Sequence, residues 1–468
     1  MERWDAVETS RRVRAGDVTA TEVVQAAIER AEAHVELAAL VTPTPERARH
    51  AARVAPTGPL AGVPTAVKDL TDVRGQPTRF GSRAVAGYVA TRTSPDAAQL
   101  LSTGMISLGK TATPELGMTA TTEPLFGPPT RNPWNPEHST GGSSGGAAAL
   151  VAGGVLPIAH ASDGGGSIRI PAAMCGLVGL KPSDDRLVRL EEMRGLPVRV
   201  AVHGVLTRTV RDTATYLSVT ERARPARGLP PVGEVRGPSR RRVRVGVVLT
   251  GYEAPVAPEV EASTRATADR LADAGHLVRE LPDPWGATFA GAFADDFLRY
   301  WALLALGGTQ LLRRKVGPGF DASRVDPLTA GLTRHARANL ARLPASIARL
   351  RRFRHRYRER FRDVDVILSP TVARTTPRLG ELRPDRSFGE LEQRLRELVQ
   401  FTPVHNVAGA PAVSLPGPQH HGLPVGIMLS GDVGDERTLL EVAFELERLA
   451  PWPLTAPEAA TGPGRPAG

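Results

Sequence analysis

The segment GGSSGGAAALVAGGVLPIAHASDGGGSIRIPA, residues 141–172, places a serine-bearing glycine cluster at each end of an Ala/Val-rich stretch. The Ala/Val-rich stretch predicts a helix, and VLPIAHA (155–161) predicts a strand that leads into the second cluster. That cluster, DGGGS (163–167), opens a second, short helical stretch. Consecutive N–H groups at the start of a helix suit a developing oxyanion, and glycine lets a carbonyl group approach them. The segment therefore makes Ser167 a candidate nucleophile, although a Gly-rich turn between core elements is the simpler interpretation of such a cluster.

Three better-known motifs also occur, and each lacks its usual context. GMISLGKT (104–111) matches the phosphate-binding pattern G-x4-G-K-T, but its four central residues predict a buried strand. SLGK in the same stretch matches the S-x-x-K motif of lactamases, which requires a helix. GGSSG (141–145) matches the nucleophile elbow G-x-S-x-G, but RNPWNPEHST (131–140) predicts a loop where the elbow needs a strand. We expect none of these three sites.

The basic residues are almost all arginine. The net charge is +10, and lysine accounts for only four of the 59 basic residues. The most arginine-rich stretch, ARLRRFRHRYRERFR (348–362), alternates cations with apolar residues at helical spacing, which predicts a solvated helix face. No zinc-finger or RNA-binding signature accompanies it, so we expect no nucleic-acid partner. The arginine bias makes each lysine informative.

Cysteine content and hydropathy limit the class of protein further. The single cysteine, Cys175, excludes an internal disulfide framework and argues against a multi-cysteine metal site. No metal and no other cofactor is expected. The chain has no stretch of about 18 apolar residues and no leading secretion signal, so we expect a cytoplasmic protein without a membrane partner.

The patterns alternate helix and strand along one interwoven α/β domain, which we place at 10–452. TATE (19–22) is a capping box that predicts an N-terminal helix, and residues 285–362 are mostly helical in pattern. A surface loop or linker is expected at 222–240. The tail at 453–468 is rich in Pro, Gly and Ala and is expected to be disordered.

The 141–172 segment resembles the signature of the amidase signature family of serine hydrolases. Three further segments are similar to that family: GPLAGVPTAVKDL (58–70), GLVGLKPS (176–183) and GLPVGIMLSG (422–431). Within the family, the chain is most similar to the group of general amidases and 6-aminohexanoate cyclic dimer hydrolases. The resemblance implies a single domain with a mixed central β-sheet covered by helices on both faces.

The resemblance also implies a Ser-Ser-Lys triad. Ser167 corresponds to the nucleophile, and Ser143 corresponds to the bridging serine, which the family holds through a cis peptide bond from Gly142. Lys68 in AVKD corresponds to the base. The residue type supports this role, because a lysine can lose its proton where an arginine effectively cannot. Without the motif, an ion pair between Lys68 and a neighbouring aspartate, Asp69 or Asp72, would be the simpler interpretation.

Six further residues receive roles around the triad. The N–H groups of Gly164, Gly165 and Gly166, with that of Ser167, are candidates for the oxyanion hole. Three supporting residues complete the set: Ser144, Asp163 and Arg169. We expect Ser144 to orient its loop by hydrogen bonding. Asp163 and Arg169 are expected to form an ion pair that braces the nucleophile turn.

The implied function is hydrolysis of the C–N bond of a small aryl, aliphatic or lactam-type amide through an acyl-serine intermediate. The expected partner is that small-molecule amide, and a homodimer stays open. Glu123, where many family members have asparagine, and the Asp184-Asp185 pair, which removes a turn glycine, depart from the family pattern. Three alternatives remain: the glutamine-hydrolysing subunit of a tRNA-dependent amidotransferase, a biosynthetic acyltransferase with the same triad, and an inactive binding protein.

Overall fold

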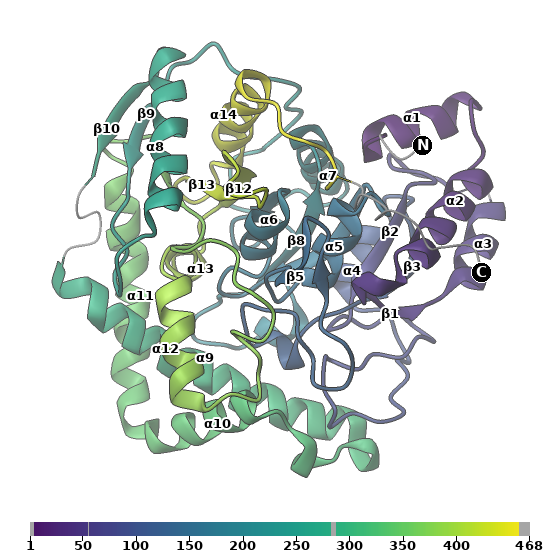
Figure 1. Cartoon of the computed structure of the whole chain (residues 1–468), viewed down its shortest axis with the longest axis horizontal. Coiled ribbons are helices and arrows are strands. Elements are labelled where there is room, and N and C mark those ends of the chain that lie inside the picture. Colours follow the sequence, from purple (N-terminus) through teal and green to yellow (C-terminus); the bar gives the residue numbers. More distant parts are fainter. Residues whose placement is uncertain (1–3, 55, 282–286, 458–468) are drawn as a thin grey trace, which may run out of the picture.

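A mixed eight-stranded sheet forms the centre of the computed structural model, which describes residues 4–54, 56–281 and 287–457 (Figure 1). The strand order is β10-β9-β11-β13-β12-β7-β8-β6. The strands are β6 (Ile158–Asp163), β7 (Val178–Lys181), β8 (Val202–Thr207), β9 (Arg244–Val247), β10 (Leu277–Glu280), β11 (Val366–Pro370), β12 (Ala412–Pro416) and β13 (Gly426–Ser430). β9 is parallel to β10 and β11, and every other neighbouring pair is antiparallel.

Helices cover both faces of this sheet, as the resemblance implied. On one face lie α7 (Val210–Ala223), α8 (Pro258–Asp273) and α14 (Glu436–Leu449); on the other lie α5 (Gly145–Ala152) and α6 (Arg169–Cys175). Strand periodicity explains the two faces: Ile427 and Leu429 of β13 pack in the core that contains α14, whereas Met428 between them packs in another cluster. Apolar residues therefore face both ways along the central strands, which is typical of a sheet buried on both sides.

A separate three-stranded sheet carries the first predicted catalytic residue. Its order is β1-β3-β2, with β1 (Leu40–Pro43), β3 (Ile106–Thr111) and β2 (Pro64–Lys68). β2 packs against β6 at the end of the central sheet, so that Lys68 at the end of β2 comes close to the nucleophile turn after β6. The GKT motif lies in β3, which confirms that this stretch is a strand and not a phosphate-binding loop.

The N-terminal helices pack beside this small sheet. They are α1 (Ala6–Ala15), α2 (Ala20–Ala33) and α3 (Pro45–Arg53), with α4 (Pro95–Leu101) preceding β3. The predicted capping box begins α2: the Thr19 side chain accepts the amide of Glu22, and the Glu22 carboxylate accepts the amide of Thr19. The short 3-10 helices of the chain are Val35–Leu37, Glu115–Gly117, Glu191–Met193, Gly317–Gly319, Ala322–Arg324 and Leu340–Arg342.

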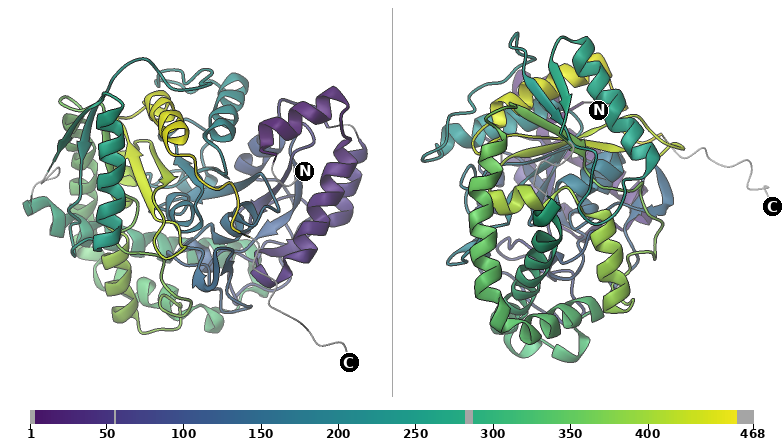
Figure 2. Two further views of the ribbon diagram at one scale, coloured as in Figure 1. Left: turned by 45° about the horizontal axis from the view of Figure 1, so that its top comes forward. Right: turned by 90° about the vertical axis from the view of Figure 1, so that its left-hand side faces the viewer.

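Four helices form a layer on one side of the sheet, in the lower half of Figure 1 and again in the right-hand view of Figure 2. They are α9 (Ala287–Val316), α10 (Pro327–Ala338), α11 (Leu343–Arg360) and α12 (Phe388–Leu398), and the short α13 (Pro403–Ala408) follows. α11 is the arginine-rich stretch: it buries Leu350, Phe353 and Tyr357 and exposes Arg352 and Arg356, which confirms the predicted solvated face.

The predicted loop at 131–140 is wrong. The expected loop at 131–140 contains a small hairpin of β4 (Arg131–Asn132) and β5 (Asn135–Ser139); its Asn and Pro residues favour turns, but backbone pairing holds the two short strands. Apart from the end of α7, residues 222–240 contain no helix or strand. Of the tail expected to be disordered, 458–468 lies outside the described residues. None of the described helices combines the length and apolar character needed to cross a membrane.

Candidate active site

The amine of Lys68 lies in a pocket of serine oxygens. The residue is fully buried, and its Nζ lies 2.8 Å from Ser143 Oγ, 2.8 Å from Ser144 Oγ and 3.1 Å from Ser162 Oγ. Burial lowers the pKa of Lys68 to about 7, although the negative charge of Asp163 acts in the opposite direction. A substantial fraction of the amine is therefore neutral near pH 7, as a general base requires.

The simpler interpretation of Lys68 as an ion-pair partner is wrong. Asp69 pairs with Lys110, whose Nζ lies 3.3 Å from its carboxylate. Asp72 pairs with Lys315 at 2.6 Å. Each neighbouring aspartate thus has another lysine as its partner, and Lys68 is left with neutral hydroxyl groups.

Ser143 follows a cis peptide bond from Gly142, as the resemblance implied. Gly142 has no room for a side chain, because a Cβ there would lie 2.4 Å from the carbonyl oxygen of Thr121. Ser144 is the residue before α5, and its hydroxyl donates to the carbonyl of Ser162 (3.2 Å). This bond ties the first glycine cluster to β6, which is the orienting contact expected of Ser144.

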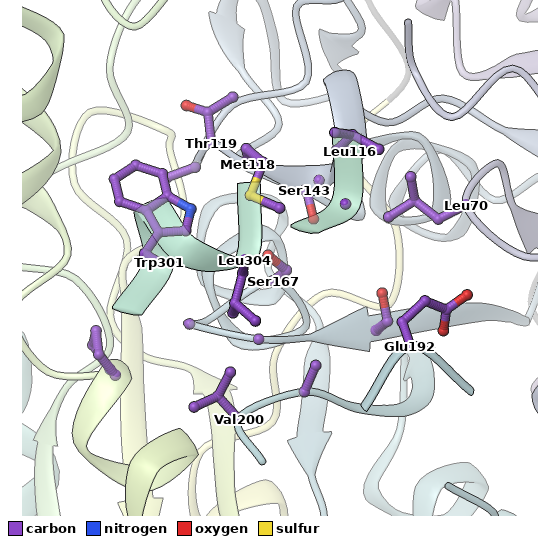
Figure 3. A pocket seen from close by; sticks show the side chains of 18 of the residues that line it. Leu70, Leu116, Met118, Thr119, Ser143, Ser167, Glu192, Val200, Trp301 and Leu304 are labelled. Atoms are coloured by element: carbon purple, nitrogen blue, oxygen red, sulfur yellow. The ribbon is translucent and has the colours of Figure 1, made fainter. Parts of the chain in front are cut away.

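Ser167 lies in the turn between β6 and α6, and its hydroxyl projects into the same pocket as that of Ser143 (Figure 3). Within the described residues, no hydrogen bond joins the two hydroxyl groups. Ser167 is partly exposed to this pocket, whereas Ser143 is buried. The predicted nucleophile is thus open to a small molecule, and the predicted bridging serine is shielded from it.

The expected ion pair braces the nucleophile turn. Asp163 and Arg169 are both fully buried, with 2.9 Å between Asp163 Oδ2 and Arg169 Nε. Burial alone would raise the pKa of Asp163, but the charge and hydrogen bonds of Arg169 hold it well below its usual value. Asn406 donates to Asp163 Oδ1 (2.8 Å) and accepts from Arg169 (2.6 Å), which completes a buried network.

One member of the predicted oxyanion hole is already engaged. The amide of Gly166 donates to Asp163 Oδ1 at 2.7 Å, so its hydrogen points to a carboxylate and away from the pocket. Gly164, Gly165 and Ser167 line the pocket. The prediction for Gly166 is therefore corrected, and the candidate donors are the amides of these three residues. Thr402 fixes the turn from behind by donating to the carbonyl of Gly165 (2.6 Å).

The pocket has a volume of about 540 Å³ and is mostly apolar. Apolar side chains form its wall. They come from the loops after β2 and β3, from α9 and from α12. They include Phe80, Phe297 and Leu395 as well as Leu70, Leu116, Trp301 and Leu304, which are labelled in Figure 3. The lining includes two cations, and both are paired. Lys315 contacts Asp72, and Arg396 contacts Glu392, Asp295 and Glu253. A pocket of this size and character suits a small apolar ligand.

Three residues that contact Lys68 or support the turn at 163–167 were not among the residues predicted from the sequence: Ser162, Thr402 and Asn406. Ser162 lies next to Asp163 in the signature, and its position on a strand beside the nucleophile turn is the signal that could have found it. Thr402 and Asn406 stand more than 230 residues from the turn that they support. No local pattern in TPVHNVAG (402–409) indicates that contact.

The departures from the family pattern lie away from the triad. Glu123 is buried, accepts from the hydroxyl of Thr121 (2.6 Å) and from the amide of Gly380 (2.8 Å), and does not line the pocket. Burial raises its pKa. Asp185 has a φ of 66°, the left-handed conformation that a turn glycine adopts and that aspartate tolerates better than most residues. Asp184 pairs with Arg354 on α11 at 2.9 Å.

No group of histidine, cysteine and acidic side chains in the described part of the chain could hold a metal ion. Cys175 is a buried free thiol, and burial raises its pKa.

A family model and the most similar relatives indicate the same protein family. The model of the Amidase family matches residues 22–440. The chain is 48% identical over 454 residues to the protein named "Putative amidase AmiC" of Mycobacterium tuberculosis (strain H37Rv), covering 96% of this chain and 95% of that one. It is 32% identical over 483 residues to the 6-aminohexanoate-cyclic-dimer hydrolase of Paenarthrobacter ureafaciens, covering 97% and 96% of the two chains.

Solved structures agree with these relatives. A structure of 6-aminohexanoate cyclic dimer hydrolase complexed with substrate superposes with a TM-score of 0.87 at 32% identity, covering 96% of this chain and 97% of that chain. A bacterial aryl acylamidase of the amidase signature family superposes with a TM-score of 0.82 at 28% identity, covering 96% of both chains.

Proposed function

The chain belongs to the amidase signature family and is a hydrolase that acts on carboxamides; from that premise we propose which residues perform the reaction and on which amides. The observation that carries the proposal is the buried amine of Lys68 at 2.8 Å from Ser143 Oγ, beside Ser167 in an apolar pocket. The family-wide Ser-Ser-Lys triad falls on these three residues. No metal or other cofactor takes part in the proposed reaction.

In the proposed mechanism, Lys68 is the base and Ser167 is the nucleophile. Neutral Lys68 takes a proton from Ser143, which takes one from Ser167 as the Ser167 oxygen attacks the amide carbon. The negative oxygen of the tetrahedral intermediate accepts hydrogen bonds from the amides of Gly164, Gly165 and Ser167. The C–N bond then breaks, and Ser143 delivers a proton to the leaving nitrogen. Water hydrolyses the acyl-serine and restores the enzyme.

The proposed substrates are amides with apolar substituents. Leu70, Phe80, Trp301 and Leu395 offer an apolar wall to the groups on either side of the scissile bond. Glutamine is a poor match, because Lys315 and Arg396 in the pocket lining are already paired with carboxylates of the protein. The carboxylate of a zwitterionic substrate would lose its hydration there without gaining a free cation, because both cations are already paired.

The experiment is a hydrolysis screen with the purified chain against aryl amides, aliphatic amides, cyclic lactams and glutamine, with released amine and acid measured separately. We expect turnover of the apolar amides and little turnover of glutamine. Ser167→Ala and Lys68→Ala should abolish turnover while the circular dichroism spectrum stays that of the wild type. Near-normal turnover in either variant refutes the triad assignment. Formation of a new amide when a free amine is added would favour acyl transfer.

We also place the enzyme in the cytoplasm, a location that its single, unpaired cysteine supports. Cell fractionation with an antibody tests that placement. Light scattering on the purified chain decides between a monomer and the homodimer that the sequence leaves open.

A further inference from the structure

Helix α9 lines the pocket along most of its length. Lining residues run from Ala294 to Lys315, which corresponds to about 30 Å of helix at 1.5 Å per residue. Leu304, near the middle of this span, lines the same pocket as Ser143 and Ser167, and it is drawn close to both in the view of Figure 3. The pocket is therefore a trough that extends in two directions from the serines, and a substrate amide can place its acyl group in one arm and its amine in the other.

The position of Ser143 distinguishes the two arms. One arm contains Leu70 and Leu116: a Cβ built on Gly117 would lie 3.1 Å from Ser143 Oγ and 2.9 Å from Leu70 Cδ1, so Leu70 and the relay hydroxyl meet at Gly117. The other arm begins at Gly165, where a Cβ would lie 3.4 Å from Phe297 of α9. The first arm thus adjoins the proton relay, and the second adjoins the oxyanion turn.

The chemistry of C–N cleavage assigns the arms. As the bond from carbon to nitrogen breaks, the electron pair stays on nitrogen, and the proton that neutralises it comes from Ser143 Oγ. The leaving nitrogen must therefore face Ser143. Its substituent extends into the arm of Leu70 and Leu116, and the acyl group that remains on Ser167 extends toward Phe297.

Gly307 and Gly308 are adjacent small residues of α9 that line the pocket, and Gly308 is the one that lies next to Leu116. A Cβ there would meet only Leu116 Cδ1, at the ordinary contact distance of 3.7 Å. It lies inside a helix, where glycine is destabilising relative to alanine, and it does not have a positive φ. Neither packing nor backbone geometry requires a glycine at this position. A side chain at position 308 would instead fill part of the pocket beside Leu116.

We propose that Gly308, Leu70 and Leu116 form the subsite for the leaving amine, and that the missing side chain at Gly308 admits a ring-sized apolar amine such as an arylamine. The inference rests on the proposed function, because it uses Ser143 as the proton donor to nitrogen. It makes Gly308 a specificity-determining residue for the amine.

The test uses two substrate series and two matched variants in the same helix. The first series keeps a phenylacetyl group and varies the amine from ammonia to methylamine to aniline. The second series keeps the primary amide and varies the acyl group from acetyl to phenylacetyl. Gly308→Leu fills the amine arm. Ala294→Leu fills the opposite arm, because Ala294 lines the trough one helical turn before Phe297.

The readout is a ratio of kcat/KM values within each protein, so that the intrinsic reactivity of each amide cancels between variant and wild type. Gly308→Leu should lower the ratio of anilide to primary amide at least tenfold, because a side chain in a fitted apolar subsite discriminates by about that factor or more. Ala294→Leu should lower the ratio of phenylacetyl to acetyl amide and change the first ratio less than twofold. All members of the first series share one acyl-enzyme, so differences among them report on the acylation step.

An unchanged anilide ratio in Gly308→Leu, or an equal loss in Ala294→Leu, overturns the subsite assignment while the amidase function stands. If wild-type protein hydrolyses no amide and Ser167 resists a fluorophosphonate probe, the proposed function itself has failed. Should Gly308→Leu not fold, Gly308→Ala gives the same comparison with a smaller expected change. Its melting temperature should equal or exceed that of the wild type, because alanine favours the helix.

Discussion

The Nζ of Lys68 lies 2.8 Å from the Oγ of Ser143 in a site where the lysine side chain is fully buried. Hydroxyl groups surround the amine, and the two nearest aspartates on its own segment, Asp69 and Asp72, are paired with other lysines. Among the residues that the structure describes, no carboxylate lies within ion-pair distance of this amine, so nothing there would offset the desolvation of an ammonium group. The site therefore favours the neutral amine, the form that can accept a proton.

The first prediction concerns the pH dependence of hydrolysis. Burial lowers the pKa of Lys68 from 10.5 to about 7, so the base is protonated and inactive below that value and neutral above it. kcat/KM for an apolar amide should therefore rise between pH 6 and pH 8 with a midpoint near 7. Lys68→Arg should be inactive throughout this range, because arginine keeps its proton. Activity that is flat from pH 5 to pH 9 would contradict the assignment of Lys68 as the base.

The second prediction compares two of the serines around Lys68, Ser143 and Ser162. Ser162→Ala removes one hydrogen-bonding oxygen from the amine, which is worth about 1–1.5 kcal/mol, and should lower kcat about tenfold. Ser143→Ala removes the proton relay and should lower kcat by about three orders of magnitude or more. Single-turnover kinetics on one anilide measures both variants. Equal losses in the two variants would show that Ser143 only supports the amine, as Ser162 does.

The third prediction concerns the ion pair under the nucleophile. Asp163→Asn leaves the buried guanidinium of Arg169 without its carboxylate, which should cost about 3–5 kcal/mol of unfolding free energy. Glu191→Gln is the matched control: its pair with Arg92 is largely exposed, so that loss should stay below about 1 kcal/mol. Denaturant unfolding followed by circular dichroism gives both values. A loss in Asp163→Asn no larger than that of the control would mean that Asn406 and the backbone hold the turn alone.

Local patterns account for the parts of the site that are close in sequence. The glycine clusters, the helix of 145–152 and the strand before Asp163 follow from residue type and spacing, and all are present in the structure. Lys68 could be selected because a base must be able to become neutral, in a chain that otherwise prefers arginine. The placement of β2 in a separate sheet beside β6 could not be predicted, because it depends on how two sheets pack.

The missed contributors have a common physical reason. Asn406 and Thr402 act on the 163–167 turn through contacts that span more than 230 residues, and neither residue type is unusual in its own helix. The sequence makes Gly166 a candidate for the oxyanion hole, because it belongs to a run of consecutive N–H groups at the start of a helix. Only coordinates reveal that its amide points to Asp163. The apolar trough likewise depends on α9, whose leucine-rich pattern predicts a buried helix but does not say what the helix faces.

The last prediction concerns stability in acid and a histidine outside the triad. His160 on β6 is fully buried beside Asp96, with 3.5 Å between Nε2 and Oδ2, and it packs against His203. Burial lowers the pKa of His160 to about 3 even though Asp96 acts in the opposite direction.

The folded protein therefore keeps this imidazole neutral, whereas the unfolded chain protonates it near pH 6.5. Because the unfolded state binds the extra proton between pH 6.5 and pH 3, His160 contributes a decrease in the free energy of unfolding as the pH drops through that window. Urea unfolding at pH 7, 6, 5 and 4 measures the slope, and His160→Gln should make it shallower. Lys68 keeps its proton in both states below pH 6, so it contributes little to the slope there, and an unchanged slope in His160→Gln would place the acid sensitivity elsewhere.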